Sequence, residues 1–217
     1  MKNFLKITLG LIMSVMMLFA FAGCGGSGSG EAAEPETPAD QAVAALDQTL
    51  AALKSADMNA IKELSGGEDV FGEAEEAFGS EEEIGAVLQA MFGNFDYTIG
   101  TPEQVDDSNV NVPVTVSNAD MSKAVSTWFS DLMAYAMSNP DIANDEAALQ
   151  AKTIEMLQSS VEKVAGEDGG ILTQDVTIPM TLSDGKWAIS DTVDDSVLDA
   201  IMGGFMTAIN DLTGGSE

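Results

Sequence analysis

Apolar residues recur every three or four positions in several segments, which is the spacing of an amphipathic helix. The first such segment covers residues 40–55, and a short second helix follows with Asp57 at its N-cap. Ser80 and Glu83 have the spacing of a capping box, which predicts a helix that ends near residue 92. Further helices are predicted at 120–138, 145–165 and 195–212.

A different pattern, in which apolar and polar residues alternate, indicates strands with one buried face. It predicts strands near 95–99, 110–116, 176–182 and 187–189. The pair Asp184-Gly185 is typical of a tight hairpin turn and joins the last two strands. The segments "VPVTVSN" (112–118) and "IPMTLSD" (178–184) share a pattern, and the proline in each is typical of an edge strand or a bulge.

The order of these elements predicts an α+β fold, in which helices cover the apolar face of a small curved antiparallel sheet. The helices at 120–138 and 145–165, divided at Pro140, form a hairpin inserted between strands. Residues 40–213 are enough for one domain.

The N-terminal segment has the features of a secretory signal. Lys2 and Lys6 precede an apolar run that ends at Ala22, and this run is shorter than a membrane-spanning helix requires. Ala22-Gly23-Cys24 resembles the lipobox of bacterial lipoproteins, which implies cleavage before Cys24 and a diacylglyceryl group on its thiol. The alternatives are an uncut membrane anchor or a secreted protein with an unused thiol.

This resemblance divides the chain into a signal peptide (1–23), a Gly-, Ser-, Pro- and Glu-rich tether (24–39) and the folded domain. It implies a protein held by lipid on the extracytoplasmic face of the cell membrane. Because the chain has a single cysteine, Cys24 has no partner for an internal disulfide, and lipidation explains its presence.

The composition excludes several classes of function. The chain has 36 acidic residues, 8 basic residues and no histidine, and its net charge is −28. An acidic surface repels phosphate backbones, so no nucleic acid partner is expected. Without histidine, the common Ser-His-Asp and Cys-His mechanisms and the usual zinc sites cannot be built. No cofactor, metal or catalytic residue is therefore predicted.

Two stretches carry a second resemblance, "AVAALDQTLAALKSADMNAIKEL" (42–64) and "VTIPMTLSDGKWAISD" (176–191). They look like the opening helices and the terminal hairpin of the nuclear-transport-factor-2-like (cystatin-like) superfamily, here as a domain of unknown function. That resemblance implies a cone between sheet and helix, which some members use as a ligand pocket. The candidate pocket residues are Phe95, Tyr97, Trp128 and Trp187, and ordinary core packing is the alternative for all four.

We therefore expect a non-catalytic protein that binds a small molecule or acts as an interaction module at the envelope surface. A filled cone with an exposed apolar patch on the methionine-rich helices would instead favour a structural or protein-binding role. An acid/base enzyme would need an Asp, Glu or Lys with a perturbed pKa inside the cone. The turns with Asp106-Asp107 and with Asp191, Asp194 and Asp195 leave calcium binding open.

Overall fold

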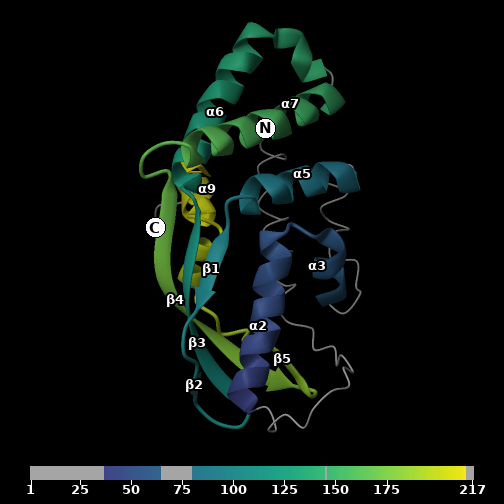
Figure 1. Cartoon of the computed structure of the whole chain (residues 1–217). Coiled ribbons are helices and arrows are strands. Elements are labelled where there is room, and N and C mark those ends of the chain that lie inside the picture. Colours follow the sequence, from purple (N-terminus) through teal and green to yellow (C-terminus); the bar gives the residue numbers. More distant parts are fainter. Residues whose placement is uncertain (1–36, 65–79, 145, 214–217) are drawn as a thin grey trace.

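The computed structural model describes residues 37–64, 80–144 and 146–213 (Figure 1). The signal peptide, Cys24 and nearly all of the tether lie outside the described residues. The described chain has seven α-helices and a five-stranded antiparallel sheet, with the helices packed against the curled sheet. The predicted α+β fold is confirmed, including the inserted helical hairpin.

The sheet is built around two long strands, β3 (Asn109–Ala119) and β4 (Ile171–Ser183), which pair along their length. Two short strands, β1 (Asp96–Ile99) and β2 (Glu103–Gln104), pair with different parts of β3. The last strand, β5 (Lys186–Ile189), forms a hairpin with β4. β2 was not predicted, because two exposed polar residues inside a turn-like segment carry no alternation.

Pro113 and Pro179 lie in β3 and β4, which both have a neighbour on each side, so the expectation that they mark edge strands is wrong. Each proline instead faces the end of a short neighbouring strand. The N–H of Gly100, just after β1, donates to the Pro113 carbonyl (2.7 Å), and the N–H of Ser190, just after β5, donates to the Pro179 carbonyl (2.8 Å). Each proline therefore lacks its N–H at a position where the hydrogen-bond ladder with the short neighbouring strand ends.

The register also explains why these two segments share a pattern. Val112 pairs with Ile178, so a local two-fold axis through this pair relates residues 112–118 to residues 178–184. Each proline occupies the equivalent place on its strand. The shared pattern therefore coincides with a local symmetry of the β3 and β4 ribbon.

The inner face of the sheet is covered mainly by α2 (Pro38–Lys54), which contacts all five strands. It is followed by α3 (Met58–Leu64) and, later, by α5 (Glu81–Phe92). The predicted caps are confirmed, because Asp57 accepts the backbone N–H of Asn59 (3.0 Å) and Ser80 accepts that of Glu83 (3.2 Å). These three helices begin within two residues of where the sequence placed them.

The helical hairpin consists of α6 (Met121–Ser138), the short 3-10 helix η2 (Pro140–Asn144) and α7 (Glu146–Ala165). It extends from one end of the sheet (Figure 1). The indole N–H of Trp128 donates to the Thr153 carbonyl (3.0 Å) and joins the two helices. Gln158 on α7 donates to the Ala86 carbonyl on α5 (3.2 Å), which attaches the hairpin to the body.

The single helix expected at 195–212 is wrong, because the chain forms α8 (Asp195–Ile201) and α9 (Phe205–Thr213) instead. Gly203 and Gly204 between them have φ of +64° and +83°, which a continuous helix does not allow. Asp199 caps α9 by accepting the backbone N–H of Met206 (2.8 Å). The predicted apolar stripe is nevertheless buried throughout: Val197, Ile201, Phe205 and Ile209.

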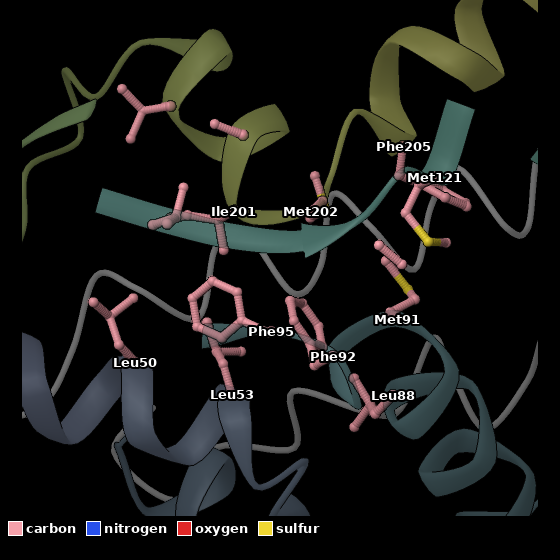
Figure 2. Packing of buried hydrophobic residues seen from close by; sticks show 14 of the residues in the cluster. Leu50, Leu53, Leu88, Met91, Phe92, Phe95, Met121, Ile201, Met202 and Phe205 are labelled. Carbon is pink, nitrogen blue, oxygen red and sulfur yellow. The ribbon is translucent and has the colours of Figure 1, made fainter. Parts of the chain in front are cut away.

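One apolar cluster joins the sheet to the helices. Figure 2 shows side chains of α2, α5 and the α8 to α9 segment gathered in it. The buried Asn118 lies at the end of β3, and its side-chain amide donates to the carbonyls of Met91 and Ile201, each at 3.0 Å. These two hydrogen bonds join β3 to the ends of α5 and α8.

Candidate functional site

An open groove lies between α2 and β1. Its volume is about 560 Å³, and we call it the α2/β1 groove. It is lined by Asp40, Val43, Ala44, Asp47, Tyr97, Thr98, Ile99 and Pro102. The four helical residues follow the spacing of one helix face, and the others come from β1 and the turn after it.

The start of α2 is fixed by a capping box that the sequence analysis did not identify. Thr37 accepts the backbone N–H of Asp40 (3.2 Å), and the Asp40 carboxylate accepts the backbone N–H and the hydroxyl of Thr37 (3.0 and 2.7 Å). The hydrogen bonds from Thr37 lower the pKa of Asp40 below its usual value. Asp40 therefore stays ionised at the mouth of the groove at neutral pH.

Tyr97 forms the wall opposite Asp47. Its hydroxyl donates to Asp47 Oδ1 (2.8 Å) and lies 3.2 Å from the Asp47 carbonyl oxygen. Burial, followed by the hydrogen bond and the negative charge of Asp47, raises the pKa of Tyr97 to about 12. The phenol is therefore a fixed neutral donor, and its ring stacks on Phe95 with 5.9 Å between centroids.

A cation already lies beside this wall. The Lys54 ammonium is 2.7 Å from Asp96 Oδ1 and 6.0 Å from the centroid of the Tyr97 ring. Asp96 Oδ1 also accepts the backbone N–H of Tyr97 (2.8 Å), and these two hydrogen bonds lower the pKa of Asp96, with that from Lys54 the larger cause.

This arrangement protects part of the sheet edge. Because Gly100 bonds to β3 and hydrogen bonds alternate in an antiparallel ladder, the backbone groups of Tyr97 and Ile99 face away from the sheet. The outward N–H of Tyr97 already donates a hydrogen bond to Asp96 Oδ1, so it is not free to pair with an added strand at this edge.

The structure places the four candidate pocket residues in three regions. Tyr97 lines the α2/β1 groove, whereas Phe95 lies behind it in the core at 2% exposure. Trp128 is 6% exposed between α6 and α7. Trp187 on β5 is 5% exposed, and its indole N–H lies 3.4 Å from Gln41 Oε1 on α2. The four rings do not meet around one cavity.

Sequence reasoning missed Asp40 and Asp47, although both lie on the polar face of a helix that it predicted. Their spacing of seven residues places them on one side of α2, two turns apart. That signal was available, but nothing in the sequence placed Tyr97 beside them, because β1 lies 50 residues further along the chain.

Two of the aspartates considered for calcium have local roles. Asp106 accepts the backbone N–H of Ser108 (2.8 Å) and the side-chain amide of Asn109, and Asp194 caps α8. Across residues 37–64, 80–144 and 146–213, no group of three or more acidic side chains is arranged to hold a metal ion.

In the same described ranges, no helix combines the length and the apolar character that crossing a membrane requires. Comparison of the chain with protein-family models, with curated proteins and with solved structures finds no match.

Proposed function

We propose that this chain is a lipid-anchored extracytoplasmic lipoprotein whose folded domain acts by binding, without catalysis. The anchor is supported by the lipobox-like Ala22-Gly23-Cys24, the apolar run before it and the Gly/Ser-rich tether after it. Two acyl chains hold a protein stably on a bilayer, and a tether of this composition keeps the domain away from the surface. The resemblance to nuclear-transport-factor-2-like domains belongs to the same proposal.

The observation that carries the binding role is the α2/β1 groove. It combines an apolar floor, two carboxylates and an aromatic wall, presented by one helix and one strand. Phe95, Trp128 and Trp187 are occupied by packing, so the groove has more support as a binding site than a cone lined by these rings.

The anchor is tested by changing the thiol that would carry it. Cys24→Ser in the full chain, expressed in a bacterium that processes lipoproteins, should abolish incorporation of radiolabelled palmitate and leave the signal segment uncut. Ser27→Ala, in the same tether, serves as the control and should be labelled and cut like the native protein. If the native protein takes up no palmitate, or if Cys24→Ser is labelled equally, the lipoprotein proposal is wrong.

The binding role is tested by native mass spectrometry of the full-length protein purified from detergent-solubilised membranes. A reproducible excess mass that is lost on denaturation, beyond that of the covalent lipid, would support a ligand-binding protein. A bare lipidated chain would argue against a tightly held ligand and favour the interaction role.

A specific observation supports that second role. Phe129, Met133 and Met137 follow one face of α6 at four-residue spacing, and Phe129 and Met137 are 38% and 82% exposed. Met137→Glu, compared with Ser130→Glu on the same helix, should remove a specific cross-linked partner in cells if this stripe binds protein. If the cross-linked partner disappears in both variants, or is kept in both, this apolar stripe does not bind protein.

A further inference from the structure

We propose that the α2/β1 groove binds a small organic cation that carries an apolar body, such as an aromatic or alkyl ammonium ion. This inference rests on the proposed binding function and names the class of its ligand. It depends on two observations: the charge of the lining residues, whose acids are not neutralised by a lysine, and the apolar floor between the acids.

The lining of the groove is negatively charged on one side. Asp40 and Asp47 are its two charged residues, and Lys54, the nearby cation, is paired with Asp96. Asp40 uses Oδ2 for the capping box and Asp47 uses Oδ1 for Tyr97. Among the described residues, none donates to Asp40 Oδ1 or Asp47 Oδ2, so each carboxylate keeps an oxygen for a ligand.

Between the two acids the surface is apolar. Val43 and Ala44 lie on α2 between Asp40 and Asp47, and Ile99 and Pro102 face them from the strand side. The acids are seven residues apart, or about 10 Å along the helix axis. A volume of about 560 Å³ leaves room for a small organic ligand.

The nearby cation of the chain is already paired outside the groove. The Lys54 ammonium lies 2.7 Å from Asp96 Oδ1 and 6.0 Å from the centroid of the Tyr97 ring, and neither Lys54 nor Asp96 lines the groove. Asp40 and Asp47 are therefore not neutralised by Lys54. An extended peptide is a poorer occupant, because Asp96 blocks the outward N–H of Tyr97. A compact cation needs no such backbone contact.

The test is a titration of the full-length protein in non-ionic detergent, followed by NMR of the Val43 and Ile99 methyl groups. The probe is 2-phenylethylammonium. Its neutral analogue 2-phenylethanol has the same shape without the charge, and methylammonium has the charge without the apolar body. We expect saturable shifts at both methyl groups with 2-phenylethylammonium, and clearly weaker binding of the other two compounds.

Two charge variants locate the interaction. Asp47→Asn keeps an acceptor for Tyr97 but removes the charge, and it should weaken binding by about two- to fivefold, as should Asp40→Asn, since exposed ion pairs contribute modestly. Asp131→Asn, an exposed acid on α6, makes the same change in net charge and should leave binding unchanged.

Several results would overturn the inference: equal binding of 2-phenylethanol or methylammonium, equal weakening by Asp131→Asn, or no saturable shift at Val43 and Ile99. None of them affects the palmitate labelling of the native protein or its loss in Cys24→Ser. An excess mass of different chemistry in the native spectrum would keep the binding function while this ligand class fails. The two failures are therefore distinguishable.

Discussion

The Tyr97 hydroxyl donates a 2.8 Å hydrogen bond to Asp47 Oδ1 and thereby joins β1 to α2 across 50 residues of sequence. Both partners line the α2/β1 groove, so the same bond closes the fold and shapes the candidate site. Its strength is set by a charged acceptor and a partly buried donor. The bond therefore predicts effects on stability and on pH dependence.

Tyr97→Phe removes this hydroxyl and keeps the ring that stacks on Phe95. We expect the free energy of unfolding to fall by about 0.5–1.5 kcal/mol, the usual contribution of one hydrogen bond. Tyr135→Phe on α6 is the matched control, because no side-chain hydrogen bond of its hydroxyl is found in the described structure. Urea unfolding of the three proteins measures the difference, and equal stability of all three would contradict the prediction.

The raised pKa of Tyr97 predicts where stability is lost at alkaline pH. Folding favours the protonated phenol, since its pKa is about 12 in the folded protein and about 10 in an unfolded chain. This contribution is therefore fully present below pH 10 and disappears as the pH rises from 10 to 12. The difference in free energy of unfolding between the native protein and Tyr97→Phe should shrink between pH 10 and pH 12. A constant difference over this range would contradict the prediction.

Much of the fold could be predicted because its signals are local. The helix periodicity, the caps at Asp57 and Ser80, and the alternation around Val112 and Ile178 each depend on a few adjacent residues. The Asp184-Gly185 turn has positive φ at both residues, as expected from its composition. These elements together were enough to indicate an α+β arrangement.

The remaining features depend on tertiary contacts. A continuous apolar stripe through Ile201 and Phe205 suggested one helix, but the stripe does not reveal that the chain turns at Gly203 to reach Met121. From the sequence alone, Asn118 would be expected to be an exposed polar residue at the end of a strand. In the structure it is buried, and its amide bonds to the ends of two helices. The groove could not be predicted either, because it depends on the contact between Asp47 and Tyr97, which lie 50 residues apart in the sequence.

Asn118 is predicted to be one of the most sensitive polar positions. Asn118→Leu removes the amide that donates to Met91 and Ile201 and leaves buried carbonyls without their donor. We expect a loss of about 1–3 kcal/mol or more in the free energy of unfolding. Asn111→Leu on the same strand, half-buried on the other face, should change stability by less than about 0.5 kcal/mol. Similar losses in both variants would show that Asn118 has no special role.

Both tryptophans are predicted to report a filled interior. Trp128 and Trp187 are almost fully buried, so acrylamide should quench their fluorescence several-fold less efficiently in the native protein than in 8 M urea. N-acetyltryptophanamide in both solvents corrects for the effect of urea. Efficient quenching of the native protein would reveal an accessible cavity beside at least one ring and would restore the cone as a binding site.

Glycine can be required for a left-handed backbone or for lack of space, and a comparison of Gly203 with Gly185 distinguishes these two reasons. Both have positive φ, of +64° and +78°, but a Cβ on Gly203 would lie 2.2 Å from the Ala119 carbonyl oxygen, whereas a Cβ on Gly185 meets nothing within 4 Å. Gly185→Ala should therefore lower the free energy of unfolding by about 1–2 kcal/mol, the cost of placing alanine in the left-handed conformation.

Gly203→Ala adds a backbone clash that a small side-chain movement cannot relieve, because α8 and α9 would have to move away from the end of β3. Its thermal unfolding midpoint should fall well below that of Gly185→Ala. If the two variants unfold at the same temperature, the close approach between Gly203 and Ala119 does not limit stability, and the break between α8 and α9 has a different cause.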